Sequence, residues 1–590
     1  MPTETRVCQN CKQDFIIDQA DFDFYKKMAV PAPTWCPTCR LQRRYSWRNE
    51  RTLYKAICGL CKKSVFSTYP GDGVITTLCH DCYFSDKWDA MSYGRDYDFS
   101  KPFFVQFAEL MQAVPQLNLW HMNTVNSPYS NISKGAKDCY LSFSIVESEE
   151  VSYCKNVDKS RQIFDGLNLM ECERCYWGMF GTQNYDVNYS IFTRSCMNSS
   201  FLFDCVNCQN CFMSANLRNR EYVFYGTQLT KEQYAAELAK INTGSYTVFQ
   251  KLIADFKKVY AGALHKYTNI IKSVNSTGNV LSGLKNSRDC FEVFDSEDVR
   301  YCGRALYLKD CMDTNNIAGA ELLYEYVSGG DAERNLKLSV ASNGAQSDCT
   351  YTGWCKSSSN LFGCVGVRDK SYCILNKQYT KEEYEALVPR IIKHMNEMPY
   401  QGKSGAVYKY GEFFPIELSP FAYNGSVAQE YSPLGKEELL SRGYNYREPE
   451  EKHPKIDVAP SELPDDSAQV GDDILQKTIG CEHTGKCVHQ CTAAFRLTPS
   501  ELAFYKRVKL PIPRQCPNCR HYDRLTWRNP WKLWPRVCQC AGAASENGSH
   551  QNTAKHVHGD VHCVEQFETS YAPERPETLY CEQCYQAEIV

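Results

Sequence analysis

The fold is decided by the stretch from Arg6 to Asn49, RVCQNCKQDFIIDQADFDFYKKMAVPAPTWCPTCRLQRRYSWRN. Two cysteine pairs lie in it, Cys8-x2-Cys11 and Cys36-x2-Cys39, in the pattern C-x2-C-x24-C-x2-C. Zinc takes four soft ligands in a tetrahedron, and a C-x2-C turn places two thiolates on one ion. The stretch therefore predicts a four-cysteine zinc module.

A second four-cysteine set follows directly. Cys58-x2-Cys61 and Cys79-x2-Cys82 form the pattern C-x2-C-x17-C-x2-C, so the stretch up to Cys82 contains two complete sets. The alternative is that these are reduced core cysteines that fall in pairs by chance. We favour zinc because the spacing is typical of structural zinc sites.

The C-terminal end of the chain repeats the first module, since Cys11 recurs as Cys491 at an offset of 480. At the same offset, Cys36, Cys39, Arg40, Arg44, Trp47 and Arg48 recur as Cys516, Cys519, Arg520, Arg524, Trp527 and Arg528. Cys487 is the nearest partner for Cys491 and makes a C-x3-C pair. The repeat predicts a third zinc set of Cys487, Cys491, Cys516 and Cys519.

The second set also recurs, at an offset of 502, as Cys563, Cys581 and Cys584. Asp560 stands where the partner of Cys58 should fall, so another residue has to complete the site. His558, His562, Cys540 and Cys538 are the candidates, and we assign Cys540 and His562 to the predicted ligand set. We expect His550 and His556 to be solvated loop residues. In all, we predict about four structural zinc ions.

Composition sets the broad class. A chain of 590 residues is too long for one core, so we expect several domains. The N-terminus lacks a signal peptide and no long apolar run occurs, so we expect a cytoplasmic protein with no membrane partner. In that compartment the 33 cysteines favour metal over disulfides, and the net charge of −3 gives no global attraction for nucleic acid.

These motifs carry a resemblance. The N-terminal modules are similar to small bacterial zinc-ribbon proteins. The similarity lies in the string C-x2-C-x3-F, then F-Y, then P-x-P-x2-C-P-x-C-R-x3-R, followed by C-x2-C-x17-C-x2-C. The larger chain, including LFGCVGVRDKSYCILNKQYTKEEYEAL at 361–387, resembles uncharacterised zinc-ribbon proteins of candidate-phyla (Patescibacteria) bacteria. The resemblance implies zinc and no particular activity.

The centre of the chain is itself duplicated at an offset of 150, for example from Cys205 and Phe212 to Cys355 and Phe362. Aromatic and β-prone residues recur with a period near 12, between Asn, Ser, Asp and Gly. This period favours a parallel β-solenoid over irregular antiparallel sheets. Residues 245–272 have helical apolar spacing and predict an amphipathic connecting helix.

The predicted class is thus an α+β multidomain protein, with duplicated zinc-ribbon or treble-clef-like modules at both termini around a β-rich centre. The predicted domains are a double zinc module at 1–100, β-rich repeat A at 125–240, the connecting helix at 241–275, repeat B with its terminal helix at 276–398, an extended surface linker at 399–480, and a second double zinc module at 481–590.

The central cysteines leave two interpretations open. Cys172-x2-Cys175 and Cys205-x2-Cys208-x2-Cys211 have the spacing of metal ligands. In the second copy, however, Ser358 and Leu361 replace Cys208 and Cys211, which preserves size or apolarity and not a ligand. We therefore favour stacked core residues.

Basic residues follow the second cysteine pair of each first module. Arginines beside a tryptophan are suited to phosphate contacts and to stacking on unpaired bases. We therefore predict nucleic-acid contacts by Arg40, Arg44, Trp47, Arg48, Arg520, Arg524, Trp527 and Arg528. The alternative is that these arginines brace the fold.

The sequence contains no predicted catalytic residues, and four-cysteine zinc sites are normally closed. We expect a non-enzymatic zinc-binding or scaffold protein, with nucleic acid as the first partner and a protein partner as the second. The remaining alternative is an enzyme that uses the last zinc site or the Cys172 and Cys175 thiols.

Overall fold

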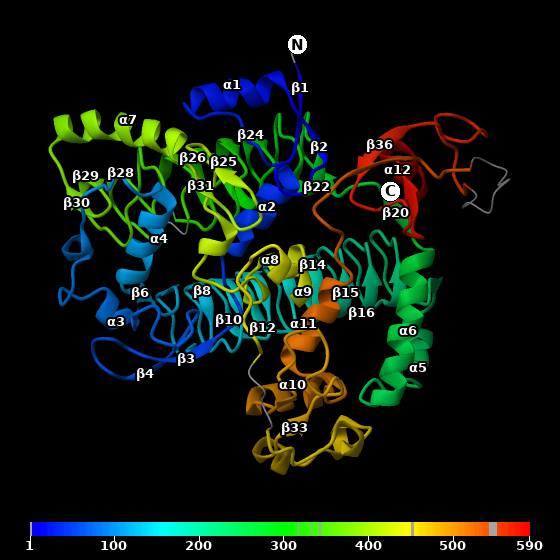
Figure 1. Cartoon of the computed structure of the whole chain (residues 1–590). Coiled ribbons are helices and arrows are strands. Elements are labelled where there is room, and N and C mark those ends of the chain that lie inside the picture. Colours follow the sequence, from blue (N-terminus) through cyan, green and yellow to red (C-terminus); the bar gives the residue numbers. More distant parts are fainter. Residues whose placement is uncertain (1–2, 317, 331, 341–343, 450–453, 542–551) are drawn as a thin grey trace.

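The centre of the chain winds into two parallel β-solenoids, solenoid A (121–228) and solenoid B (270–378), as the sequence period predicts (Figure 1). The structure is a computed structural model that describes residues 3–316, 318–330, 332–340, 344–449, 454–541 and 552–590. The two solenoids run in opposite directions beside each other (Figure 1). They touch where the Arg304 guanidinium donates to the side-chain oxygen of Asn156.

The rungs of solenoid A repeat with the predicted period of 12. Parallel strand partners are offset by that number, as in Lys155 with Leu167 and Tyr185 with Met197. The strands of solenoid A are β7 (His121–Met122), β8 (Asn131–Lys134), β9 (Phe143–Val146), β10 (Glu149–Ser152), β11 (Lys155–Asp158), β12 (Arg161–Phe164), β13 (Leu167–Met170), β14 (Tyr176–Thr182), β15 (Tyr185–Ile191), β16 (Met197–Phe203), β17 (Phe212–Ala215), β18 (Val223–Phe224) and β19 (Thr227–Gln228).

Solenoid B has two longer rungs. Ala320 pairs with Glu333 and Arg334 bridges to Ser347, both at an offset of 13, which explains its looser sequence spacing. The strands of solenoid B are β21 (Ile270–Ile271), β22 (Gly278–Ser282), β23 (Cys290–Phe294), β24 (Glu297–Arg300), β25 (Gly303–Met312), β26 (Ala318–Tyr324), β27 (Glu333–Lys337), β28 (Ser359–Phe362), β29 (Ser371–Ile374) and β30 (Lys377–Gln378).

A second period of three lies inside the period of 12. From residue 138 to 162 every third residue has a positive φ, and the residue after each of them points inward and is buried. A positive φ is energetically unfavourable for every residue except glycine. Among the other residues, asparagine and aspartate tolerate this left-handed conformation best. Side-chain ladders offset part of that cost, as where Asn156 donates to Asn168 one rung on (2.6 Å).

Cysteine and serine alternate in this narrow interior because they meet the same hydrogen-bonding need. The Ser142 hydroxyl donates to the carbonyl of Tyr140 (3.0 Å), and the Cys154 thiol donates to the carbonyl of Ser152 (3.1 Å). Burial raises the pKa of Cys154 to about 12, so it remains a protonated thiol. Cys154 therefore acts as a core residue, and the thiols of Cys172, Cys175, Cys208 and Cys211 also donate to the carbonyl two residues before them.

Long helices cover the solenoids and also connect them. Helix α6 (Tyr246–Gly262) packs Phe249 and Tyr260 against Phe201 and Phe203 of solenoid A. The predicted helix at 245–272 therefore ends early, because the chain continues into strand β20 (Leu264–Lys266), which pairs with the C-terminal module. The other helices of the centre are α4 (Phe103–Ala113), α5 (Lys231–Leu238), α7 (Lys381–Glu397) and the 3-10 helix η1 (Ala90–Tyr93).

Four modules flank the centre, and each joins a β-hairpin to a helix. Module N1 contains β1 (Glu4–Val7), β2 (Asp14–Ile17), α1 (Gln19–Lys27) and α2 (Pro37–Ser46). Module N2 contains β3 (Tyr54–Ile57), β4 (Ser64–Ser67), β5 (Thr77–Leu78) and α3 (His80–Tyr83), and its β5 pairs with β6 (Gln116–Leu117). Module C1 contains β33 (Ile479–Gly480), β34 (Ala494–Phe495), α10 (Pro499–Val508) and α11 (Pro517–Leu525), and module C2 contains β35 (Trp534–Val537), β36 (Gln566–Thr569), β37 (Thr578–Tyr580) and α12 (Glu582–Ile589).

The described residues of the segment 399–480 pack into the fold, where the sequence predicts an extended surface linker. Phe413, Phe414 and Tyr423 are buried in the core shared with module N1, because apolar aromatic residues are dense there. Its elements are β31 (Tyr400–Gln401), β32 (Val407–Tyr408), α8 (Ala428–Tyr431), α9 (Lys436–Ser441) and the 3-10 helices η2 (Ile416–Leu418), η3 (Tyr423–Gly425), η4 (Pro460–Glu462), η5 (Ser467–Gln469) and η6 (Asp472–Gln476). Among the described residues, no helix has the length and apolar character needed to cross a lipid bilayer.

Candidate metal centres

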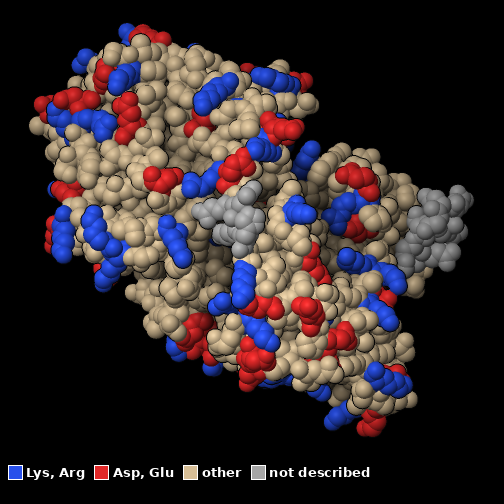
Figure 2. All heavy atoms as spheres, turned by 60° about the horizontal axis from the view of Figure 1, so that its bottom comes forward, with Lys and Arg blue, Asp and Glu red and all other residues tan. Residues whose placement is uncertain are grey.

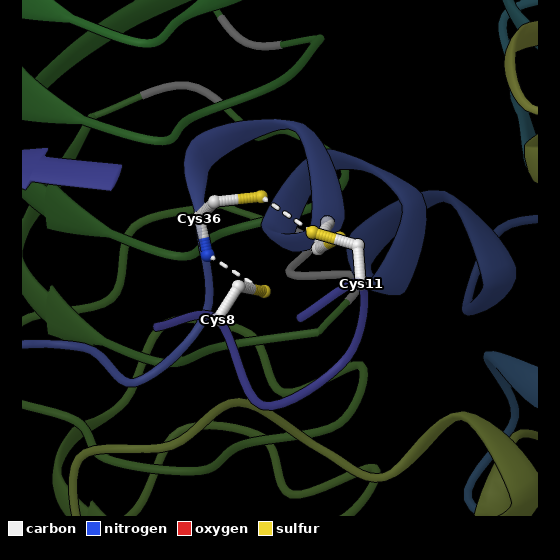
Figure 3. Close-up of side chains that lie close together, drawn as sticks. Cys8, Cys11 and Cys36 are labelled. Carbon is white, nitrogen blue, oxygen red and sulfur yellow. Dashed lines mark hydrogen bonds between the residues drawn. The ribbon is translucent and has the colours of Figure 1, made fainter. Parts of the chain in front are cut away.

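Each module builds its cysteine cluster in the same way. The first ligand follows a hairpin strand, and the third is the N-cap of a helix whose first turn carries the fourth. In N1 the amide of Cys36 donates to the Sγ of Cys8 (3.2 Å), as Figure 3 shows. The cluster is therefore held jointly by a hairpin and a helix N-terminus, as in a treble-clef-like module.

The distances between sulfur atoms fit zinc. The donor atoms of Cys8, Cys11, Cys36 and Cys39 all lie within 4.8 Å of one another, as do those of Cys58, Cys61, Cys79 and Cys82. The Sγ atoms of Cys11 and Cys36 are 3.8 Å apart, and those of Cys61 and Cys79 are 3.7 Å apart. A tetrahedron with Zn–S bonds of about 2.3 Å has edges of about 3.8 Å. Both N-terminal sets have the geometry to hold the ion that the sequence predicts.

Backbone amides and helix ends favour the thiolate form that metals require. Burial by itself raises the pKa of Cys58, but the backbone amides of Cys79, Cys61 and Leu60 outweigh it and lower this pKa to about 6. A thiolate at the N-terminus of a helix also faces the positive end of the helix dipole. The backbone amides therefore favour the thiolate form of Cys58 at neutral pH.

The third cluster differs from the prediction in one residue. Cys481, which the sequence analysis did not consider, groups with Cys491, Cys516 and Cys519. Cys481 directly follows β33, as Cys8 follows β1, and its Sγ accepts the amide of Cys516 (3.2 Å). The hairpin loop of C1 is longer than that of N1, so counting residues from Cys491 led to Cys487, which lies in the loop.

The fourth cluster is completed by Cys538, and neither Cys540 nor His562 belongs to it. Cys538 groups with Cys563, Cys581 and Cys584, and its Sγ accepts the amide of Cys581 (3.3 Å). It directly follows β35, which is the position of Cys58 after β3. His562 is exposed, and its Nδ1 faces the carbonyl of Cys540. Of the two histidines expected to be solvated, His556 is buried, and His550 lies outside the described residues.

The predicted nucleic-acid residues lie inside the molecule. Arg40 and Arg44 of α2 both bind the carboxylate of Asp313 in solenoid B, at 2.8 and 3.0 Å. Arg520 and Arg524 of α11 bind Asp165 in solenoid A, at 2.8 and 2.7 Å. All four guanidinium groups are at least nine-tenths buried. They brace the fold and present no surface to a phosphate.

The other residues of this predicted set are also covered. Trp47 and Arg48 are buried, and Trp47 donates to the carbonyl of Pro415. Trp527 stacks on Phe256 of α6 (5.8 Å between ring centres). Arg528 is partly buried, lies over the ring of Tyr431 and donates to the carbonyl of Glu430. These contacts belong to the interface between the modules and the solenoids.

The two arginine sites are copies of each other. Tyr153 lies under Arg520 and donates to Glu501, and Tyr301 lies under Arg40 and donates to Asp21. Tyr176 packs edge-on against Tyr505, as Tyr324 does against Tyr25. Asp165, Tyr153 and Tyr176 recur as Asp313, Tyr301 and Tyr324 at an offset of 148.

This docking is crosswise. Module N1 precedes solenoid A in the chain, yet its arginines bind solenoid B, and module C1 follows solenoid B but binds solenoid A. The second modules contact both solenoids. Arg368 of solenoid B donates to the carbonyl of Tyr83 in N2 (2.5 Å), and Phe66 of N2 packs on Tyr129 of solenoid A. Arg218 of solenoid A donates to the hydroxyl of Tyr585 in C2 (2.9 Å), and Asn279 of solenoid B donates to Ser570 of C2. The crosswise docking is therefore made by the arginine helices of modules N1 and C1.

A buried charge network lies between the two docking sites. Lys155 of solenoid A binds Glu50 beyond α2 (2.7 Å) and Glu430 of α8 (2.6 Å). Burial by itself raises the pKa of Glu50, but Lys155, Arg48 and Arg304 outweigh it and lower this pKa to about 2. Glu50 is therefore ionised, and the network joins solenoid A to the residues that follow α2 and to α8 of the segment 399–480.

Asp165 and Asp313, which pair with the buried arginines, do not stand out in the sequence. A sequence signal for them exists, because an aspartate occupies the same place in both solenoids. In the structure, Asp165 and Asp313 also share a positive φ. The offset of 150 between the two copies applies only after the two longer rungs of solenoid B. Before those rungs the offset is 148, so the pair was not matched.

No protein-family model matches this chain, and no curated protein matches it. The resemblance to zinc-ribbon proteins of candidate-phyla bacteria therefore stays a prediction. The fold and the clusters together define a cysteine-rich β-solenoid protein that has four-cysteine groups able to hold metal near both termini.

Proposed function

We propose that this protein is a non-enzymatic zinc-binding scaffold, in which structural zinc ions fasten two antiparallel solenoids into one body. The observation that carries the proposal is the crosswise docking. Each helix that binds a solenoid through two arginines begins at a cysteine pair of a cluster, Cys36 and Cys39 in α2 and Cys516 and Cys519 in α11. A metal ion in the cluster thus fixes the start of the helix that places the arginines.

The ligand sets favour a structural role over catalysis. Each of the four clusters supplies four thiolates, which fill the tetrahedral positions of zinc and leave none for water or substrate. Cys538 fills the position that the sequence left open in the last site, and that open position was the main basis for an enzymatic alternative.

A protein is the partner class we propose. The arginines that favoured nucleic acid in the sequence are buried in ion pairs. On the face drawn in Figure 2, basic and acidic side chains are interspersed and form no single basic patch. Solenoids offer long continuous faces, which suit an extended protein partner.

The test of the zinc scaffold is metal removal from the full chain. We expect purified protein to contain at least four tightly bound zinc ions per chain, measured by inductively coupled plasma mass spectrometry. Removing them with a chelator should lower the melting temperature and enlarge the radius of gyration in solution scattering, because the arginine helices lose their anchors. Protein without bound zinc, or with an unchanged melting temperature after zinc removal, would contradict the proposal.

The partner class needs a separate measurement. We expect labelled single-stranded RNA, single-stranded DNA and duplex DNA to show no tight, salt-sensitive binding in fluorescence anisotropy. Binding that weakens steeply with salt would instead restore nucleic acid as the partner.

A further inference from the structure

The two C-terminal modules differ from the N-terminal ones in the loop between the first and second ligands. Two residues separate Cys8 from Cys11, and Cys58 from Cys61. In C1, nine residues separate Cys481 from Cys491, and in C2 the loop between Cys538 and Cys563 is longer still. Both loops bring additional nitrogen and sulfur donors next to the completed four-cysteine cluster.

In C1 the loop supplies His483, Cys487 and His489. Their donor atoms and the Sγ of Cys519 all lie within 4.8 Å of one another, and the Sγ atoms of Cys487 and Cys519 are 3.7 Å apart. The Nδ1 atoms of both histidines are buried and have no hydrogen-bond partner. Buried polar atoms are almost always satisfied, so unpartnered imidazole nitrogens beside two thiols point to a ligand.

In C2 the loop supplies Cys540, His556 and His558. The Sγ of Cys540 lies 3.5 Å from His556 Nδ1 and 3.5 Å from His558 Nε2. The two ring nitrogens are 3.2 Å apart, and His558 Nε2 is 3.2 Å from the Sγ of Cys584. Two thiols and two imidazole nitrogens therefore form one group that is connected by contacts of 3.2–3.5 Å.

These distances match a tetrahedral zinc ion. With Zn–S bonds of about 2.3 Å and Zn–N bonds of about 2.0–2.1 Å, the sulfur-to-nitrogen edge is about 3.6 Å and the nitrogen-to-nitrogen edge about 3.3 Å. The ring of His556 is also oriented for this role, because its Nε2 faces the carboxylate of Glu588 at 2.8 Å. Histidines that bind metal through one nitrogen usually hold a carboxylate with the other.

Each additional group shares one cysteine with the neighbouring cluster. Cys519 belongs to both groups in C1, and Cys584 belongs to the four-cysteine cluster of C2 and faces His558. Each C-terminal module thus assembles five cysteines and two histidines, although the histidines and the extra cysteine come in a different order along the two loops.

We propose that each C-terminal module holds two zinc ions bridged by one thiolate, that of Cys519 in C1 and that of Cys584 in C2. This inference rests on the zinc scaffold proposed above and raises the zinc content from four ions to six. Five thiolates against two divalent ions leave a net charge of −1 per centre, lower than the −2 of an isolated four-cysteine site. The loops thereby stabilise two adjacent ions in a module that otherwise holds one.

The test counts the metal in the full-length, zinc-loaded protein by native mass spectrometry after removal of loosely bound ions. We expect six zinc ions per chain. Four ions would overturn the bridged pairs and leave the zinc scaffold intact, whereas fewer than four would contradict the scaffold itself. The two failures are therefore distinguishable.

Variants locate the additional ions. His483→Ala with His489→Ala should lower the content to five, and Cys540→Ser with His556→Ala should also lower it to five. The matched control is His80→Ala with His121→Ala, a pair of neighbouring histidines in the N-terminal half that belong to neither candidate centre, and it should keep six. Loss of no ion from either loop variant would overturn the assignment.

Cobalt(II) gives a readout that does not depend on the variants. Two cobalt ions that share a thiolate couple magnetically, so part of the electron paramagnetic resonance signal expected for isolated ions should be missing in the fully loaded protein. A signal equal to the sum of independent ions would overturn the bridge.

Discussion

At the residue scale, the carboxylates of Asp313 and Asp165 decide how the ends attach to the centre. Each is buried and receives two arginines from one helix. A buried ion pair is weak evidence for net stability, but removing one partner leaves charges buried without compensation. The consequence is that these two positions are far more sensitive than the many exposed ion pairs.

Replacing Asp313 by Ala should therefore destabilise the protein by about 3–5 kcal/mol, since Arg40 and Arg44 lose their partner. Asp165→Ala should behave in the same way. The measurement is the shift in the chemical denaturation midpoint of the zinc-loaded chain.

The matched control is Asp310→Ala, which removes a partly exposed ion pair with Lys27 and should change stability by less than about 1 kcal/mol. An equal effect of the Asp310 and Asp313 substitutions would refute the special role of the buried carboxylate.

The interior cysteines make a second prediction at this scale. Cys154→Ser should cost little, about 1 kcal/mol or less, because serine occupies equivalent inward positions and bonds the same carbonyl. Cys154→Leu should cost about 1–3 kcal/mol or more, because the narrow interior has no room for the larger side chain. Thermal unfolding of both variants checks the predicted order of stability. A serine variant that is less stable than the leucine variant would contradict it.

Ligand identity shows what sequence reasoning can and cannot reach at this scale. The tight C-x2-C turns fix the N-terminal ligands by spacing alone, and the structure groups the same eight cysteines. In C1 and C2 the first ligand is set by its place after a hairpin strand, and a loop of variable length hides that place. Cys481 is therefore found only from the strand position, and the same position selects Cys538 from the candidates that the sequence offers.

At the scale of elements, the sequence repeats predicted the solenoid, but the point where one element ends and the next begins depends on long-range strand pairing. The period of 12 is visible in the sequence because every rung must stack on the next. The period of three was missed because left-handed positions accept many residue types once neighbouring rungs fix them. The end of α6 was missed because β20 pairs with β37, which lies near the other end of the chain.

His265 in β20 makes this junction sensitive to acid. Its ring is held by Tyr571 (3.1 Å) and by the carbonyl of Tyr260 (2.8 Å), and burial lowers its pKa to about 4. The folded protein keeps His265 neutral, whereas the unfolded chain protonates it below about pH 6.5. Its contribution to stability is complete above that pH and is lost as the pH falls from about 6.5 to about 4.

We therefore expect the melting temperature of His265→Gln to fall less between pH 7 and pH 5 than that of the original chain. Zinc loss at low pH affects both proteins, so the difference between them isolates the histidine. Parallel pH dependence of the two melting temperatures would show that His265 does not titrate with unfolding.

At the scale of the whole molecule, no local sequence pattern predicts the crosswise arrangement of modules and solenoids. The residues that meet, such as Arg44 and Asp313, are 269 positions apart, and either solenoid offers the same type of site. The sequence could predict duplicated modules and duplicated solenoids, but it could not decide which module binds which solenoid.

Cutting the chain in the exposed turn after Lys240 tests this arrangement. Fragment 1–240 then holds Arg40 and Arg44 without Asp313, and fragment 241–590 holds Arg520 and Arg524 without Asp165. We expect the co-expressed fragments to elute together as a one-to-one complex in size-exclusion chromatography, and each fragment alone to aggregate. Two fragments that are soluble and monomeric by themselves would contradict the crosswise docking.

The same arrangement sets an order on synthesis. Module N1 leaves the ribosome first, but the carboxylate that its Arg40 binds follows 273 residues later. At about 5–20 residues per second, that delay is roughly 14–55 s. During this time the helix carries buried-type arginines with no counter-charge, and only its own cysteine cluster can hold it in shape. On the zinc scaffold proposed above, we expect the nascent chain to capture zinc in module N1 before solenoid B is synthesised, whereas module C1 emerges when solenoid A is already complete.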